Sequence, residues 1–151
     1  MTRPSTLRTV CRGEQGFTLI ELMLAVAVIA VLLGAITLGA SAVNSGRLST
    51  TEQDIMTLYK AGAAWASQQA NPTFSGVTMA LLKSSGVIPN SISGNNPWGN
   101  AYTPSGTLTT FTVVTDVSTA ANCNALVARL NVRAASASCG ATATSTITVN
   151  F

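Results

Sequence analysis

The chain has 151 residues, which is enough for one small domain with a single hydrophobic core. Charged residues make up only 9% of the sequence, and hydrophobic residues make up 47%. The net charge of +3 does not indicate nucleic-acid binding, because three of the eight cations lie in the first sixteen residues and the remainder is nearly neutral.

The first sixteen residues are polar and basic, and they carry Arg3, Arg8 and Arg12. The run from Leu22 to Val43 contains no charged residue and is long enough to cross a bilayer. Cations that precede a membrane segment keep that end of the chain in the cytoplasm. We therefore expect the N-terminus to be cytoplasmic and everything past Val43 to lie on the far side of the membrane.

One long helix is predicted from Phe17 to Gln69, because this stretch is rich in strong helix formers and lacks proline. After Val43 its apolar residues recur at helical spacing, with polar residues largely between them. Asn71-Pro72 ends the pattern, since a residue before proline avoids the helical region. Such a helix is about 80 Å long. A domain this small cannot bury it, so its first half needs lipid or other copies of the chain as a partner.

The residues after Pro72 predict a small α+β domain. A short helix is expected to end at Gly86, and a Thr/Val-rich stretch favours a strand. The expected elements are a helix over Val77–Ser85, a strand over Thr107–Val117, a helix over Thr119–Leu130 and a strand over Ser145–Phe151. We expect an antiparallel sheet packed on the second half of the long helix. The predicted organisation is a leader at 1–16, a hydrophobic half at 17–44 and a head domain at 45–151.

Three cysteines leave one without a partner. Cys11 lies in the cytoplasmic leader, where thiols stay reduced, whereas Cys123 and Cys139 lie past the membrane segment in an oxidising space. The topology therefore predicts a disulfide between Cys123 and Cys139. The alternative is that both are buried free thiols.

Glu21 is an unusual residue, because a carboxylate at the start of a membrane segment is costly without a partner. No partner for it is visible within the apolar run. If the chain were cut after Gly16, however, Phe17 would carry a new amine, which is largely protonated at neutral pH. Glu21 of one subunit could then pair with the Phe17 amine of a neighbour and set the register of an assembly.

The stretch Gly16–Leu22 closely resembles the processing site of type IV prepilins and of their relatives, the type II secretion pseudopilins. The resemblance implies that a membrane prepilin peptidase cuts between Gly16 and Phe17 and then N-methylates Phe17. Farther along, ALLKSSGVIP and the NPWGN stretch at Asn96–Asn100 are similar to type IVb major pilins. The implied protein is a structural subunit with the pilin fold, held in the inner membrane and then built into a helical homopolymer, an extracellular pilus, by separate assembly machinery.

Three other interpretations of the N-terminal half stay open. Ala40-Ser41-Ala42 offers a site for an ordinary signal peptidase, but the apolar run is longer than a usual signal peptide and contains Glu21. A plain single-pass anchor would hold an exported binding protein at the membrane. A pseudopilin would form a short periplasmic fibre instead of a surface pilus.

Enzyme chemistry is not expected. The chain has no histidine, and past the membrane segment its only carboxylates are Glu52, Asp54 and Asp116. No metal cluster, phosphate-binding loop or nucleophile–base pair is visible, so we expect no cofactor and no nucleic-acid site. Trp98 and Tyr102 are expected to hold a loop on the core.

Overall fold

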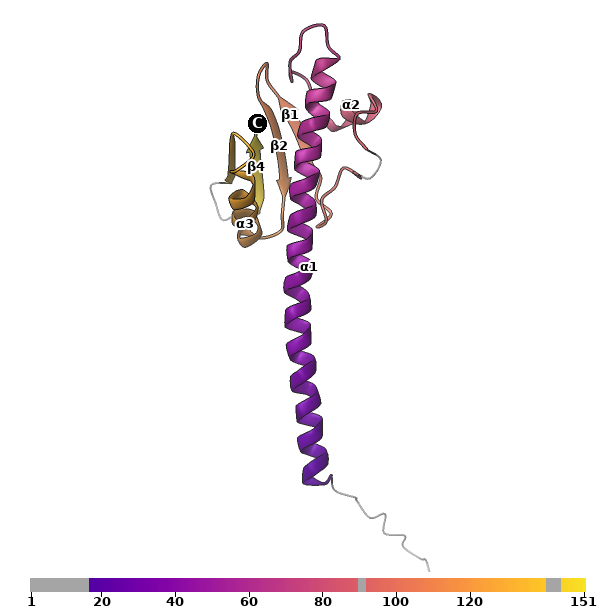
Figure 1. Cartoon of the computed structure of the whole chain (residues 1–151), viewed down its shortest axis with the longest axis vertical. Coiled ribbons are helices and arrows are strands. Elements are labelled where there is room, and N and C mark those ends of the chain that lie inside the picture. Colours follow the sequence, from indigo (N-terminus) through magenta and orange to yellow (C-terminus); the bar gives the residue numbers. More distant parts are fainter. Residues whose placement is uncertain (1–16, 90–91, 141–144) are drawn as a thin grey trace, which may run out of the picture. The chain divides into compact units, whose positions relative to one another are not determined.

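The computed structural model describes residues 17–89, 92–140 and 145–151 (Figure 1). The chain divides into two compact units, Met1–Ala40 and Ser41–Phe151. Helix α1, Leu19–Ser67, contributes residues to both units. Its bounds confirm the long helix predicted from the sequence, with two residues fewer at each end. The predicted division at residues 16 and 44 stays a prediction.

In the first unit, none of the large apolar side chains of α1 that the structure describes is buried within the chain. Leu, Val, Ile and Ala favour the helix by their composition, but no other element covers them. The exposed residues here are Phe17, Leu19, Ile20, Leu22, Met23, Leu24, Val26, Val28, Ile29, Val31, Leu32, Leu33 and Ile36. Each is at least 52% exposed.

In the second unit, α1 packs against a sheet. Its buried residues Leu48, Ile55 and Leu58 recur at helical spacing and join the core of the head domain. Gly62 is required where the helix meets the sheet, because a Cβ atom there would lie 2.5 Å from Cε2 of Phe111. The Phe111 ring is fully buried, so α1 and the sheet approach closely at this point.

The sheet has four strands in the order β1-β2-β4-β3, and all neighbours are antiparallel. The strands are β1 (Thr103–Gly106), β2 (Phe111–Asp116), β3 (Ser136–Cys139) and β4 (Thr146–Asn150). Alternate residues of β2 and β4 are buried, as expected for a sheet with one face on the core. The α+β class and the antiparallel sheet predicted from the sequence are confirmed.

Two short helices complete the head. Helix α2 spans Met79–Ser84, and Gly86 follows it with φ +71°, a conformation that suits glycine. Helix α3 spans Ala120–Leu130 and is capped by Thr119, whose side chain accepts from Asn122 N. Both helices were predicted at these places.

The predicted strand over Thr107–Val117 is wrong at its start. Residues 107–110 form the connection between β1 and β2, and β2 begins at Phe111. The sequence did not predict β1 or β3 at all. Both lie at the edges of the sheet, where Pro104 is tolerated and where the small residues of β3 suffice.

Candidate functional site

The N-terminal motif begins outside the described residues, since Gly16 and Cys11 lie there. Phe17 is 87% exposed and precedes α1, and Glu21 lies in the first turn of the helix. Glu21 is exposed as well. Cleavage after Gly16 and methylation of Phe17 therefore stay predictions.

Thr18 and Glu21 together cap the start of α1. The backbone N–H of Thr18 donates to Glu21 Oε2 at 3.1 Å, and the Thr18 hydroxyl donates to the same oxygen at 2.9 Å. In return, Glu21 N lies 3.4 Å from Thr18 Oγ1. This reciprocal arrangement is a capping box, and it fixes the first turn of the helix.

The capping box gives Glu21 hydrogen-bond partners within the chain that were not predicted from the sequence. The signal was present in the sequence as a threonine three residues before a glutamate, directly ahead of an apolar run. Thr18 is uncharged, however, so the hydrogen bonds leave the negative charge of Glu21 uncompensated. Moving that charge out of water would be costly unless it were paired with an opposite charge or neutralised by a proton.

The surface that follows the motif is almost purely apolar. Side chains of Leu22, Met23, Val26, Ala27 and Ala30 line a shallow groove along α1. Within the described ranges, α1 is the one helix whose length and composition would let it cross a membrane.

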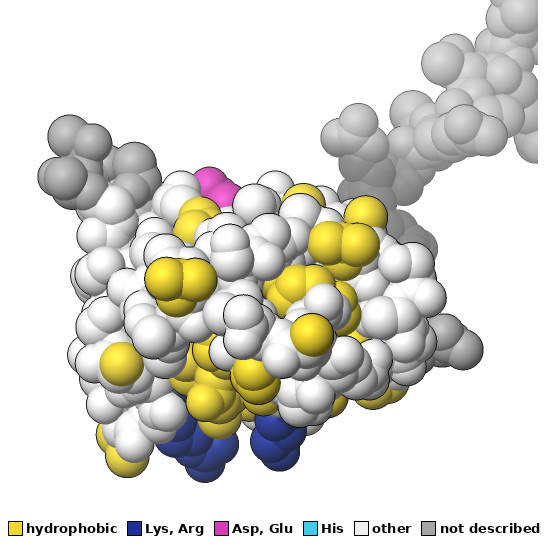
Figure 2. Space-filling view, turned by 90° about the horizontal axis from the view of Figure 1, so that it is seen from above, with side chains coloured by type: hydrophobic (Ala, Val, Ile, Leu, Met, Phe, Trp, Pro, Cys, Tyr) yellow, Lys and Arg dark blue, Asp and Glu magenta, His cyan; other side chains and the backbone are white. Residues whose placement is uncertain are grey.

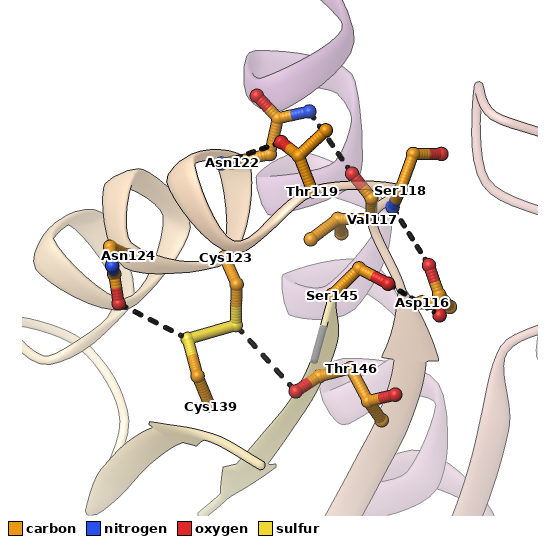
Figure 3. Close-up of a disulfide and its surroundings, with 10 residues drawn as sticks. All are labelled: Asp116, Val117, Ser118, Thr119, Asn122, Cys123, Asn124, Cys139, Ser145 and Thr146. Atoms are coloured by element: carbon orange, nitrogen blue, oxygen red, sulfur yellow. Dashed lines mark hydrogen bonds between the residues drawn. A yellow bond between two sulfur atoms is a disulfide. The ribbon is translucent and has the colours of Figure 1, made fainter. Parts of the chain in front are cut away.

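The disulfide predicted from topology is present. Cys123 of α3 and Cys139 at the end of β3 are bonded, with Cα atoms 6.0 Å apart (Figure 3). One sulfur lies 3.6 Å from the carbonyl oxygen of Thr146 in β4, and the other lies 3.5 Å from Asn124 Oδ1. The bond therefore ties α3 to the edge of the sheet, as expected.

A polar corner holds the turn between β2 and α3 next to this disulfide. Asp116 accepts from Ser118 N and from the Ser145 hydroxyl, both at 2.7 Å (Figure 3). Asn122 donates to Val117 O at 3.0 Å and accepts from the Asn44 side chain of α1 at 2.8 Å. The start of α3 is thereby fixed to both the sheet and the long helix.

The NPWGN stretch forms a loop anchored by one buried side chain. Asn96 is 4% exposed, and its Oδ1 accepts from the backbone N–H groups of Trp98 and Asn100, each at 3.0 Å. Its Nδ2 donates to Thr115 Oγ1 at 3.0 Å and also to the carbonyl of Asp116. The sequence did not predict this role of Asn96, because its partners on β2 are distant along the chain.

Tyr102 holds the same region to α1. It is 3% exposed, and its hydroxyl donates to Asp54 Oδ2 at 2.9 Å. Partial burial raises the pKa of Asp54 above its ordinary value, although the Tyr102 hydrogen bond opposes that shift. Burial and the neighbouring Asp54 carboxylate raise the pKa of Tyr102. The prediction that Tyr102 secures a loop agrees with these contacts.

Three charged residues of the head form ion pairs between α1 and the region of α3. Glu52 of α1 lies 3.4 Å from Arg133 and 3.9 Å from Arg129, so it connects α1 to the end of α3. Across the part of the chain that the structure describes, no group of three or more acidic, histidine or cysteine side chains is placed to hold a metal ion. Figure 2 shows a face made mostly of uncharged polar groups and backbone, with basic side chains gathered at one edge.

Comparison with known proteins identifies the N-terminal segment. The profile of the prokaryotic N-terminal methylation motif matches residues 11–37. No curated protein matches the chain. The matched residues include Gly16, Phe17, Thr18 and Glu21, so the chain carries a prepilin-type N-methylation motif, which supports a pilin-like or pseudopilin-like prepilin. The motif marks a structural protein that a prepilin peptidase processes, and together with the apolar helix it supports a membrane-anchored precursor.

Proposed function

We propose that the chain is the structural subunit of a type IV pilus, made as a prepilin that is cut after Gly16 and N-methylated on Phe17. The observation that supports this most is the exposure of every large apolar side chain from Leu19 to Ile36, on a helix that opens with the methylation motif. Such a surface is not stable in water, so a protein that carries it needs lipid or copies of itself.

The proposed cycle uses both partners in turn. The segment 17–44 is first stored in the inner membrane, with the leader in the cytoplasm. After cleavage, inner-membrane assembly machinery moves the subunit out of the bilayer, and the apolar helices of many subunits form the core of a helical filament. The head at 45–151 then forms the outer surface of an extracellular pilus.

Charge pairing completes the proposed assembly step. In an apolar filament core, Glu21 loses water and its capping hydrogen bonds from Thr18 do not neutralise it. The amine of Phe17 on a neighbouring subunit is the opposite charge that cleavage provides. Pairing the two sets the axial register between subunits.

The test is the intact mass of the protein recovered from fibres sheared off the cell surface. We expect a chain of 135 residues that starts at Phe17 and carries one additional methyl group. A chain that starts at Met1 would indicate a plain anchor for an exported binding protein, and one that starts after Ala42 would indicate an ordinary secreted protein. A processed chain found only in the periplasm, with no surface fibres, would indicate a type II secretion pseudopilin.

Replacement of Gly16 by tryptophan provides the matched variant. We expect uncut precursor in the membrane and no fibres, because the peptidase must fit the residue that precedes the cut. The same substitution at Gly13, three residues earlier, is the control and should leave processing intact. Normal cleavage of the Gly16→Trp protein would contradict the proposed site.

A further inference from the structure

Arg47 is the first charged residue after Glu21 on helix α1. The 25 residues from Leu22 to Gly46 carry no charge. In a helix they span about 38 Å. That length exceeds the hydrocarbon core of a bilayer, about 30 Å, and approaches the thickness with headgroups, about 40–45 Å. When this run spans a bilayer, Glu21 and Arg47 therefore reach opposite headgroup layers.

The side chain of Arg47 is exposed, and no carboxylate that the structure describes neutralises it. Glu52, the nearest acid along the helix, is engaged by Arg129 and Arg133. Asp54 accepts from Tyr102. Among the described residues no carboxylate lies within ion-pair distance of Arg47, and its own backbone carbonyl accepts from the Thr51 hydroxyl.

The other cations of the head differ from Arg47 in their surroundings or in their position. Lys83 donates to the carbonyl of Ser93 at 2.8 Å. Lys60 is exposed, but it lies 13 residues farther along α1, about 20 Å beyond Arg47. Among the cations that the structure describes, only Arg47 combines an exposed guanidinium with a place at the end of the uncharged run.

We propose that Arg47 binds a phospholipid phosphate in the leaflet on the head side of the membrane and so fixes how deep the stored subunit lies. A guanidinium suits this task, because its fork of N–H donors matches a phosphate in two parallel hydrogen bonds. Its long apolar stem reaches along the helix toward the headgroups. The phosphate supplies the negative charge that no described carboxylate provides. Arg47 releases the phosphate when the subunit leaves the bilayer.

The proposal rests on the membrane storage in the proposed function, so the experiment measures the two separately. The full chain, labelled with ¹³C-arginine and ¹³C-valine, is placed in phospholipid bilayers, and dephasing of the guanidinium carbons by lipid ³¹P is recorded by solid-state NMR. Transfer of magnetisation from lipid acyl chains to the valines of the apolar run is measured on the same sample and reports whether the run spans the bilayer.

We expect Arg47→Gln to remove the dephased signal of one arginine, roughly one sixth of all guanidinium intensity, since the chain has six arginines. The leader arginines contribute equally to both samples and cancel in the difference. Lys60→Gln, the matched loss of one exposed cation on the same helix, should change nothing. If the apolar run contacts the acyl chains but the guanidinium dephasing in Arg47→Gln equals that of the wild type, the lipid site alone would be overturned. Absence of acyl-chain contact would overturn membrane storage and the lipid site together.

Discussion

Positions 29 and 55 of helix α1 are both isoleucine, yet Ile29 is 55% exposed and Ile55 is fully buried. Ile55 lies in the unit Ser41–Phe151, where a sheet covers the helix. Ile29 lies in the unit Met1–Ala40, where no described residue covers it. The helix therefore forms in both units by local preference, but only the second half is stabilised by contacts within the chain.

This difference separates two kinds of requirement on the sequence. In the head, residues must match particular partners, as Gly62 matches the ring of Phe111. In the first unit, the proposed function requires only that residues be apolar and helix-forming, because the partners it assigns to them are lipids or copies of the same surface. Glu21 is the exception there, and its charge is the feature that most needs a specific partner.

The largest effect is expected from replacing Glu21. Glu21→Ala should give cleaved, membrane-resident protein with fibre numbers reduced about tenfold or more, because the neighbour's amine is left unpaired at every subunit. Glu21→Gln separates the charge from the cap, since glutamine can still accept from Thr18 in a capping box. We expect it to fail as alanine does. Fibres are counted by electron microscopy at equal subunit level.

The two variants also define what would contradict the pairing. Normal fibres from Glu21→Gln would mean that the carboxylate serves only to start the helix and that apolar packing sets the register. In that case Thr18→Val, which removes the hydroxyl and keeps the shape of the side chain, should be the variant that fails. Neither substitution should alter the unfolding of the head, because Thr18 and Glu21 belong to the other unit.

The second prediction compares the two isoleucines directly. Ile55→Ala should lower the free energy of unfolding of the head by about 2–5 kcal/mol, because it leaves a cavity in a fully buried site. Ile29→Ala is the matched control and should leave the unfolding of the head unchanged. Near-UV circular dichroism during urea unfolding in detergent measures both. Equal losses from the two substitutions would show that the halves of α1 do not differ in this way.

The third prediction concerns a bond that only the head possesses. Cys139→Ser opens a loop with 15 residues between the cysteines, which should cost about 3 kcal/mol in the chain-entropy description. Cys11→Ser removes the remaining cysteine and should cost nothing. Thermal unfolding of the head measures the loss, and thiol labelling of the denatured, unreduced protein should find Cys123 and Cys139 unreactive. Two reactive thiols at these positions would show that the bond does not form in the cell.

The elements differ in how well the sequence predicted them. Periodic stretches were placed well, because the second half of α1, α3 and β4 each bury residues at the spacing of their own geometry. Strands β1 and β3 were missed because an edge strand needs few large residues, and TPSG or SASC reads as a turn or as loop.

Polar contacts were the least predictable part of the site. The bonds of Asn96 to β2 and of Asp54 to Tyr102 join residues that lie 19 and 48 positions apart, and no local pattern marks such pairs. Thr18 is different, because its bond to Glu21 is local and follows a known spacing. The disulfide could be predicted without any such contact, because the side of the membrane on which each cysteine lies leaves Cys123 and Cys139 as the pair.

The smallest expected effect concerns Asp54, the head's partly buried counterpart to Glu21. Burial raises the pKa of Asp54 above its ordinary value of 3.8, so folding favours the protonated carboxyl. The associated stability is fully present below pH 3.8 and is lost as the pH rises through the raised pKa. Asp54→Asn removes this dependence. The free energy of unfolding of the wild-type head, relative to that variant, should therefore fall across this acidic interval and then level off toward neutrality.

Tyr102→Phe extends the same test, because the Tyr102 hydroxyl is the group that opposes the rise in the pKa of Asp54. Without that hydroxyl the pKa of Asp54 should rise further, and the fall in stability should move to higher pH. Glu21→Gln is the control from the other unit, and it should leave the pH profile of the head unchanged because Glu21 is bonded to Thr18 within the unit Met1–Ala40. Urea unfolding at closely spaced pH values measures all three variants. A pH profile for Tyr102→Phe that coincides with that of the wild type would mean that the pKa of Asp54 does not depend on this hydrogen bond. Solvent would then screen the charge of Asp54 in the head, as it screens the charge of Glu21 at the exposed end of α1.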